Sequence, residues 1–334
     1  MKGRVEHASG VPYAAMKDVL VLTPVYNDWE SLRILLGHLD ALARSGRFRI
    51  SVVAIDDGST DKMPENLFPS GAYSSLTFVD VLEMQCNVGH QNAIAIGLAE
   101  VTRREELSEN LAVVVMDCDG EDDPEDIPRL LQTFSTHPGH IVLAHRKERS
   151  EGPVFVIFYH IYKLLFRLAT GHGISFGNFC VLPLTIARRL TFMSQLWNSL
   201  PASVVRSRIP NVLLPTQRGQ RFCGSSHMNF VSLVLHGYNA IAVFSDIVFI
   251  RIFLFVLGIS TLTSILVILI RFLTDWVPHL WATIMVGFMT VVLAMTLISL
   301  ISFSLLTLQI RSQLRIVPGL HGRMFLRRVL RVIG

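Results

Sequence analysis

The sequence predicts an α/β domain built on a doubly wound sheet, followed by a two-helix transmembrane hairpin. Short apolar runs alternate with amphipathic stretches from residue 18 to about residue 144, which is the pattern of strands and helices in a doubly wound fold. Two long uncharged segments then fill residues 252–270 and 280–308. Carboxylates are concentrated in the first half, and Asp275 is the only acidic residue after Arg251. The chain therefore divides into a polar first part and an apolar last part.

The domain part is expected to run from residue 18 to residue 225. Apolar runs predict five strands, and helical spacing of apolar residues predicts three helices between them. The strands are expected at 19–22, 50–55, 76–81, 111–116 and 141–144, and the helices at 30–43, 91–101 and 125–134. Continuous apolar strands are typical of a mostly parallel sheet covered by helices on both faces. Ligands of such sheets bind beyond the carboxyl ends of the strands.

Residues 153–170 predict an amphipathic helix with a basic face. His160, Lys163 and Arg167 recur at spacings of three and four, opposite aromatic and apolar side chains. A helix of this kind lies in the plane of a membrane interface, although a surface helix that packs on the core shows the same pattern. Residues 226–250 are expected to hold a second, juxtamembrane helix.

The segments 252–270 and 280–308, which together make up a membrane region at 251–309, are each long enough to cross a hydrocarbon core of about 30 Å. Trp276 and Trp281 are placed for an aromatic belt. A hairpin returns the chain to the side that it left, and the tail at 310–334 is rich in arginine. The positive-inside rule therefore places both the domain and this basic tail in the cytoplasm, in an integral protein of the inner membrane.

Bulk composition narrows the class of protein further. Hydrophobic residues make up 51% and charged residues 17%, with a net charge of +4. No basic stripe is interleaved with aromatic residues, so nucleic acid is not an expected partner. The four cysteines have no metal-type spacing, which fits a reduced, cytosolic domain. The N-terminal tail, residues 1–17, is polar and has no apolar run typical of a signal peptide.

The acidic run at residues 117–125 directly follows a predicted strand. Carboxylates gathered at a strand end repel one another unless a cation is bound. Ligand sets made only of oxygen favour Mg²⁺ or Mn²⁺, which leave coordination positions for substrate phosphates. An acidic helix N-cap at Asp123 and Glu125 is the alternative. Capping accounts for those two residues but not for Asp117 and Asp119.

Polar clusters also follow two other predicted strands. Asp56 and Asp57 begin the run Asp-Asp-Gly-Ser-Thr-Asp, whose residue types suit either a sharp turn or a carboxylate that accepts from the N–H of a nucleobase. Residues 23–27 and 87–92 are expected at the same edge of the sheet, which strengthens the second interpretation.

Taken in order, these segments resemble the family 2 glycosyltransferases, which have the GT-A fold, a Rossmann-like mixed sheet. The chain is most similar to polyprenyl-phosphate glycosyltransferases, such as dolichyl-phosphate mannose synthases and bactoprenol glucosyltransferases. Their Asp-x-Asp-x-Gln-x-Pro-Pro-Glu run matches residues 117–125. The other segments that carry the resemblance are Thr23-Pro24-Val25-Tyr26-Asn27, Asp56 to Asp61, Asn87-Val88-Gly89-His90-Gln91-Asn92-Ala93, Arg146 with Arg149, Gly177-Asn178-Phe179, residues 221–224 and the C-terminal hairpin.

The resemblance implies metal-dependent, inverting transfer of a sugar from a nucleotide sugar to a polyprenyl phosphate. It places the cation on Asp117, Asp119 and Glu121, and the acceptor phosphate on Arg146 and Arg149. Asp117, Asp119, Arg146 and Arg149 are then the expected catalytic residues. The donor is expected to contact Pro24, Tyr26, Asn27, Asp56, Asp57, Asn87, Gln91, Asn92, Asp117 and Arg221, with Asp57 on the base and Arg221 on a covering loop. A UDP-sugar is favoured over GDP-mannose as the donor, and the hairpin favours a homo-oligomer.

Three residues depart from the family pattern. Glu121 stands in place of the metal-binding Gln, Asp123 in place of the first Pro, and Asn178 where many relatives have Asp. Two alternatives remain at this point. A processive polysaccharide synthase shares the catalytic fold but has a Gln-x-x-Arg-Trp run that this chain lacks. A non-catalytic membrane adaptor with a glycosyltransferase fold is the other.

Overall fold

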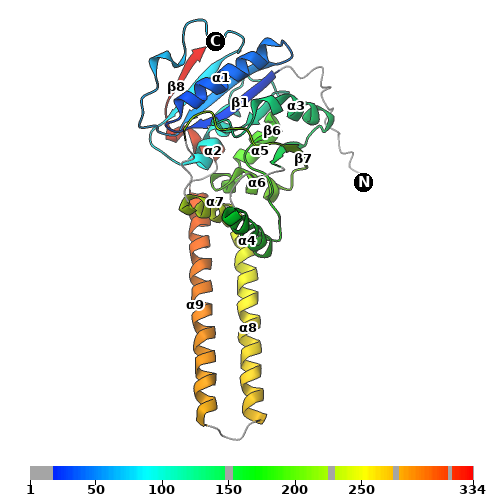
Figure 1. Ribbon diagram of the computed structural model, residues 1–334, viewed down its shortest axis with the longest axis vertical. Helices are drawn as coiled ribbons and strands as arrows, with labels where there is room; N and C mark the ends of the chain where they lie inside the picture. The colour runs from blue at the N-terminus through cyan, green and yellow to red at the C-terminus, as the bar shows by residue number, and fades with distance from the viewer. Residues whose placement is uncertain (1–17, 147–152, 225–229, 274–277, 315–317, 334) are drawn as a thin grey trace.

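A computed structural model describes residues 18–146, 153–224, 230–273, 278–314 and 318–333. An α/β domain stands above two long antiparallel helices, with two shorter helices crossing between them (Figure 1). This arrangement confirms the predicted fold class.

An eight-stranded mixed sheet forms the centre of the domain, in the order β7-β5-β6-β4-β1-β2-β3-β8. The pairs β1–β2, β1–β4, β2–β3 and β5–β7 are parallel, whereas β6 and β8 pair antiparallel with their neighbours. The strands are β1 Asp18–Val25, β2 Arg49–Asp56, β3 Val79–Met84, β4 Ala112–Val115, β5 Ile141–Arg146, β6 Cys180–Pro183, β7 Asn211–Thr216 and β8 Leu326–Ile333.

Helices cover both faces of this sheet. Alternate residues of each strand point to opposite faces, so Val19 and Val21 lie in one buried cluster and Leu20 and Leu22 in another. Helices α1 Trp29–Arg44 and α3 Ile127–Thr136 supply apolar residues to the first cluster, and α2 His90–Val101 and α5 Leu184–Thr191 to the second. Smaller elements connect them: η2 Glu65–Leu67, η3 Pro124–Asp126, η4 Ser194–Trp197 and α6 Leu200–Ser207.

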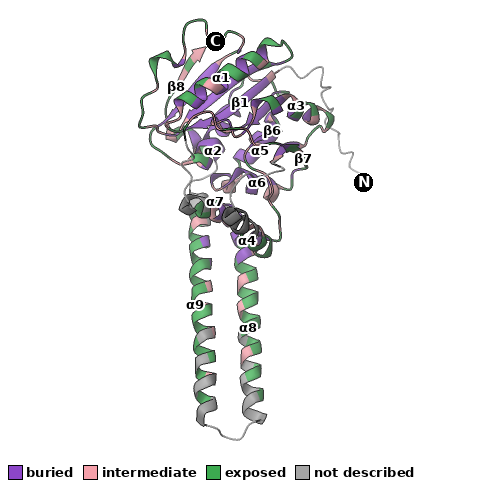
Figure 2. Cartoon of the chain, in the orientation of Figure 1, coloured by how far each residue is buried: buried purple, intermediate pink, exposed green. Residues whose placement is uncertain are grey.

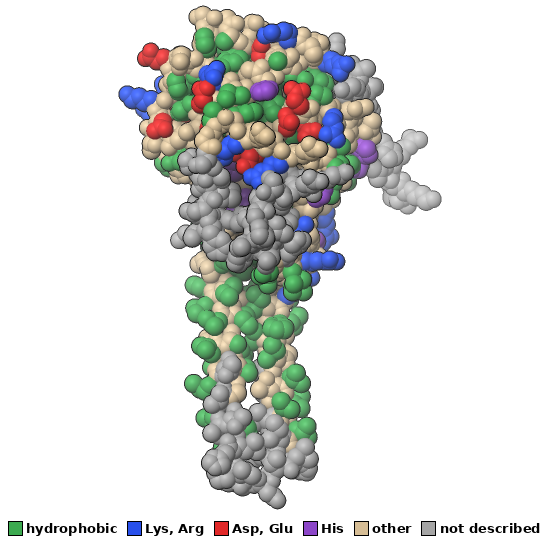
Figure 3. Space-filling view, in the orientation of Figure 1, with side chains coloured by type: hydrophobic (Ala, Val, Ile, Leu, Met, Phe, Trp, Pro, Cys, Tyr) green, Lys and Arg blue, Asp and Glu red, His purple; other side chains and the backbone are tan. Residues whose placement is uncertain are grey.

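Two C-terminal helices, α8 Ser245–Leu273 and α9 Pro278–Leu314, form the hairpin. Their stretches 245–263 and 287–308 are long and apolar enough to cross a membrane, and only 6% and 11% of these stretches are buried. Exposed apolar side chains cover the described parts of both helices (Figures 2 and 3). Both helices extend beyond the predicted limits of 252–270 and 280–308. Long apolar helices without internal burial are expected of a membrane hairpin.

A third apolar cluster joins the domain to the hairpin. It contains residues of α4 Pro153–Thr170, α6, α7 Phe230–Ala242, α8 and α9. The described part of α4 exposes Leu164, Leu165 and Leu168 by 55–64% beside this junction. A helix was predicted at this position, and its place in a membrane interface stays a prediction.

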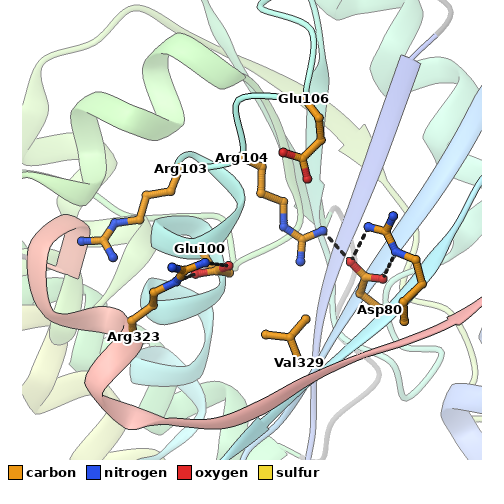
Figure 4. A pocket seen from close by; sticks show the side chains of 8 residues that line it. Asp80, Glu100, Arg103, Arg104, Glu106, Arg323 and Val329 are labelled. Carbon is orange, nitrogen blue, oxygen red and sulfur yellow. Dashed lines mark hydrogen bonds and ion pairs between the residues drawn. The ribbon is translucent and has the colours of Figure 1, made fainter.

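The C-terminal segment does not end as the predicted basic tail. After α9 the described residues form α10 Pro318–His321, η5 Gly322–Phe325 and β8, which pairs antiparallel with the edge strand β3. Arg331 forms a bidentate pair with Asp80, and Arg323 pairs with Glu100. These pairs line a shallow pocket between α2 and β8 (Figure 4). Arg103 and Arg104 also line this pocket. Arg323, Arg328 and Arg331 are therefore counter-ions of the domain's own acids.

Candidate active site

The carboxyl ends of β1, β2 and β4 bring three of the predicted polar clusters to one edge of the sheet. The side chain of Asn27 bonds the cluster after β1 to the cluster after β2. Its Nδ2 donates to Oγ1 of Thr60 at 2.9 Å, and its Oδ1 accepts from the backbone amides of Thr60 and Asp61 at 2.9 and 3.0 Å. Asn27 has a φ of 51°, a conformation that asparagine adopts more readily than most residues. Asn27 is thus bonded within the protein, while the neighbouring Tyr26 is 47% exposed.

Asp57 is buried, with 3% of its surface exposed. Its carboxylate accepts from the backbone amides of Val88 and Gly89, at 2.7 and 3.0 Å. Burial raises the pKa of Asp57 to about 6, more than these hydrogen bonds lower it. Asp56 accepts from the amide of Ser59 at 2.8 Å. Asp57 therefore holds the segment that follows β3 beside the end of β2.

The loop of residues 117–123, called here the acidic loop, follows β4. The amide of Asp117 donates to Oδ2 of Asp122, and the amide of Glu121 donates to Oδ1 of Asp119, both at 3.0 Å. Burial and the nearby charge of Asp117 raise the pKa of Asp119. Asp123 accepts from the amide of Glu125 and caps η3. The capping interpretation is thus correct for Asp123, and it leaves Asp117 and Asp119 for another role.

A second loop, residues 217–223, lies against the acidic loop and is called here the arginine loop. Nη1 of Arg221 lies 2.9 Å from Oδ2 of Asp119, and its Nη2 lies 3.2 Å from Oδ2 of Asp28. Nη2 of Arg218 lies 2.6 Å from Oε1 of Glu121. Two carboxylates of the predicted cation site are therefore each paired with a guanidinium group. Sequence reasoning placed Asp28 in a polar cluster at the end of the first strand without assigning it a role, and it missed Arg218, which stands three residues before Arg221.

His90 opens α2 and faces the acidic loop. Its Nε2 lies 3.2 Å from Oδ1 of Asp117 and 3.0 Å from Nδ2 of Asn178. Desolvation lowers the pKa of His90, whose side chain is still 43% exposed, but the charges of Asp117, Asp57 and Asp122 more than compensate, so the net shift is upward. The predicted motif contained His90 without assigning it a role.

Gln91 links this group to α6. Its Nε2 donates to Oδ1 of Asn178 at 2.9 Å, and its Oε1 accepts from the amide of Leu200, the first residue of α6, at 2.8 Å. A backbone amide only donates, so Leu200 fixes the orientation of the Gln91 amide and, through it, that of Asn178. Ala202 of α6 belongs to the apolar cluster at the base of the hairpin. Bonded side chains therefore connect the acidic loop to the membrane end of the domain.

The structure describes some of the remaining predicted residues but not all of them. Asn87 is exposed, and Nδ2 of Asn92 donates to the carbonyl oxygen of Val88. Pro24 lies in β1, and Arg146 is the last residue of β5. The side chain of Arg146 and all of Arg149 lie outside the described residues.

The acidic loop offers ligands that suit a hard divalent cation, because Asp117 and Asp119 both supply carboxylate oxygens. Burial is the main cause of the raised pKa of Asp119, and the charge of Asp117 adds a repulsion that a cation would relieve. Within the described part of the chain, however, no three His, Cys, Asp or Glu side chains are arranged to hold a metal ion. Glu121 does not complete a third ligand in this arrangement, since its carboxylate faces Arg218.

The family model described as glycosyl transferase family 2 matches residues 20–182. This segment runs from β1 to β6 and contains the acidic loop. Residues 20–182 form a family 2 glycosyltransferase domain. An undecaprenyl-phosphate 4-deoxy-4-formamido-L-arabinose transferase of Klebsiella pneumoniae is 26% identical over 242 residues, 69% of this chain and 68% of that protein. The same enzyme of Photorhabdus laumondii is 28% identical over 143 residues, 43% of this chain. The chain spans only 41% of the length of this second relative.

A solved structure has the fold of this glycosyltransferase domain. Glucosyl-3-phosphoglycerate synthase from Mycobacterium tuberculosis, in complex with Mn²⁺, UDP-glucose and phosphoglyceric acid, aligns with a TM-score of 0.50 at 14% identity. The alignment covers 71% of this chain and 81% of the other. At this identity the likeness establishes the fold, which is of the GT-A type.

Proposed function

We propose that this protein transfers a sugar from a nucleotide-sugar donor to a polyprenyl phosphate, with inversion, at the cytoplasmic face of the inner membrane. One observation carries the proposal: contacts run from Asp117 of the acidic loop through His90, Asn178 and Gln91 to α6, which packs in the apolar cluster at the base of the hairpin. The relatives are named as undecaprenyl-phosphate transferases, which supports the same class of acceptor.

The donor's diphosphate would lie over the acidic loop. Asp117 and Asp119 would hold Mg²⁺ or Mn²⁺, which would neutralise the nucleoside diphosphate as it leaves. Arg221 is placed to exchange its ion pair with Asp119 for a phosphate oxygen, a partner that suits a guanidinium group. The base would lie towards Asp57 and the segment 87–92 that Asp57 holds, with Pro24, Tyr26, Asn27 and Asp56 at its rim. A UDP-sugar is our preferred donor.

The acceptor supplies its own nucleophile. A phosphate monoester has a second pKa near 6 and is largely a dianion at neutral pH, so its oxygen can attack the anomeric carbon without a general base. That carbon forms a bond to the phosphate oxygen while its bond to the diphosphate oxygen breaks. Arg146 and Arg149 would hold the acceptor phosphate in line, so the protein's contribution is alignment and charge neutralisation.

The membrane elements serve the same reaction. A polyprenyl chain stays in the bilayer, so the site must lie close to the membrane surface. The exposed leucines of α4 would rest in the interface, and the hairpin would fix the height of the domain. The hairpin also offers apolar surface for association between copies of the chain.

The deciding experiment incubates membranes that contain the protein with a panel of labelled nucleotide sugars and extracts the lipids. We expect a labelled product that depends on added Mg²⁺ or Mn²⁺ and on a polyprenyl phosphate. The Asp119→Ala variant should give none while it remains in the membrane fraction. Glu105→Gln, which removes one exposed charge after α2, is the control and should retain transfer. Transfer by Asp119→Ala at the wild-type rate would refute the cation site.

A further inference from the structure

Glu121 stands at the position where the resemblance implied a metal ligand, yet its carboxylate faces Arg218. Nη2 of Arg218 lies 2.6 Å from Oε1 of Glu121, and the side chains are 26% exposed for Arg218 and 18% exposed for Glu121. The backbone reinforces this contact, because the amide of Gly219 donates to the carbonyl oxygen of Glu121 at 3.0 Å. Glu121 is thus bonded to the arginine loop through both its side chain and its main chain.

The rest of the arginine loop fits closely on the acidic loop. The amide of Phe222 donates to the carbonyl oxygen of Asp119 at 2.7 Å, and the Phe222 ring stacks on His38 with centroids 5.4 Å apart. A Cβ at Gly219 would overlap the carbonyl oxygen of Gly120. The position 219 therefore requires glycine for the two backbones to approach this closely.

The two arginines of the loop differ in what they hold. Arg221 pairs with Asp119, whose carboxylate would also be a ligand of the cation. A cation and Arg221 therefore compete for the same carboxylate. Arg218 pairs with Glu121 and neutralises the charge that Glu adds where the family has an uncharged Gln. The site thus gains no net negative charge from the substitution.

We propose that Glu121 is a positioning residue that holds the arginine loop over the acidic loop through Arg218, and that the cation is held by Asp117 and Asp119 without it. The part of the proposal that concerns the cation rests on the proposed function. When a cation binds, Arg221 gives up Asp119, while the Arg218–Glu121 pair remains and keeps the loop in place beside the diphosphate.

The first test measures hydrogen–deuterium exchange in the full-length protein in detergent, without donor or metal. We compare Glu121→Gln, Arg218→Gln and the double variant over peptides that contain the amides of Gly219 and Phe222. Each single variant should speed exchange there by about 5- to 30-fold, the effect of losing one or two kcal/mol of local stability. The double variant should exceed neither single variant, because both remove the same pair.

Two control variants remove the same charges elsewhere. Glu125→Gln and Arg189→Gln alter exposed side chains and should leave exchange of the arginine loop unchanged. Circular dichroism checks that every variant is folded, and Arg218→Gln gives the result independently should Glu121→Gln fold poorly. Wild-type exchange in both single variants would overturn the proposal.

The second test measures Mn²⁺ affinity by electron paramagnetic resonance. Loss of a group tied to the metal weakens binding by about 10-fold or more, as we expect for Asp119→Asn. Glu121→Gln should weaken Mn²⁺ binding by less than about 3-fold, the effect of a screened charge nearby. An equal loss in both variants would make Glu121 a ligand and overturn the proposal. Absence of Mn²⁺ binding to the wild type would instead count against the proposed function, while the exchange measurements still decide the role of the pair.

Discussion

Arg221 donates from Nη1 to Oδ2 of Asp119 across 2.9 Å, although 102 positions separate the two residues in the chain. This contact joins the loop after β7 to the loop after β4, and it places a guanidinium group where a divalent cation is expected. A partly buried carboxylate such as that of Asp119 can exchange its arginine partner for a divalent cation, because the doubly charged ion attracts the carboxylate more strongly. The first prediction follows from this contact.

Asp119→Asn should lower sugar transfer by at least about 100-fold, a loss typical of removing one electrostatic contact from a charged transition state. The amide keeps the size of the side chain but cannot hold a cation as a carboxylate does. Initial rates with labelled donor and extracted lipid measure the effect, and Glu105→Gln provides the control. A loss of less than 10-fold would contradict the prediction.

Gly219→Ala should separate the arginine loop from the acidic loop, since its Cβ would overlap the carbonyl oxygen of Gly120. We expect KM for the nucleotide sugar to rise by about 10-fold, the equivalent of about one charge-assisted hydrogen bond. Gly173→Ala is the matched control, because nothing lies within 4 Å of a Cβ at that position. Equal kinetics for the two variants would show that the contact between the loops does not affect the donor.

Asp57 makes stability depend on pH. Its pKa is about 6 in the folded protein against an ordinary value of 3.8, so the folded state binds the proton more tightly than the unfolded state. Stability should therefore fall as pH rises from about 4 to about 6, by roughly 3 kcal/mol in total, and then level off. Asp57→Asn lacks this dependence.

Denaturant unfolding in detergent, from pH 4 to pH 8, measures this effect as the difference between wild type and Asp57→Asn. Other titrating groups cancel in that difference. A difference that stays constant across the range, or that grows in favour of the wild type as pH rises, would be inconsistent with the burial of this carboxyl group.

Asp80 should depend more on Arg104, which follows α2, than on Arg331 of the C-terminal strand, since Asp80 is 1% exposed and pairs with both. Arg104 is itself buried, so Arg104→Gln should cost about 3 kcal/mol. Arg331 is half exposed, and Arg331→Gln should cost about 1 kcal/mol or less. Urea unfolding monitored by tryptophan fluorescence ranks the two, with Arg189→Gln as the control. The reverse order would place the main support of Asp80 at the strand.

The leucines of α4 should matter for the lipid acceptor and not for the donor. Leu164→Asp combined with Leu168→Asp places charges where the helix meets the interface, and we expect transfer to polyprenyl phosphate to fall by at least about 10-fold. Donor binding and retention in the membrane fraction should be unchanged. Phe192→Asp, at a residue that is 56% exposed beyond the end of α5, is the control and should transfer normally.

Local pattern was sufficient to predict the central strands and the hairpin. β1 and β2 are continuous apolar runs, and the structure places them within a few residues of the predicted limits. The acidic loop and the segments 23–27 and 56–61 were expected at one edge of the sheet, and Asn27 does bond to residues 59–61 there. Parallel strands make this convergence a consequence of topology, so strand order and polarity suffice to predict it.

Contacts between distant segments could not be predicted in this way. The β8 sequence mixes arginines with valine, leucine and isoleucine without strict alternation. Its partners Asp80 and Glu83 lie about 250 positions earlier, and the segment was interpreted as a basic tail. Glu121 was recognised as a departure, whereas its partner Arg218 depends on how the loop after β7 folds back. Ion pairs over such separations leave no periodicity in the sequence.

Calorimetric titration of the intact protein with nucleoside diphosphates, with and without Mg²⁺ or Mn²⁺, tests the central claim most directly. The account predicts binding that requires the divalent cation and disappears in Asp119→Asn. Binding of equal strength without any cation, or no binding of any nucleoside diphosphate in its presence, would contradict it.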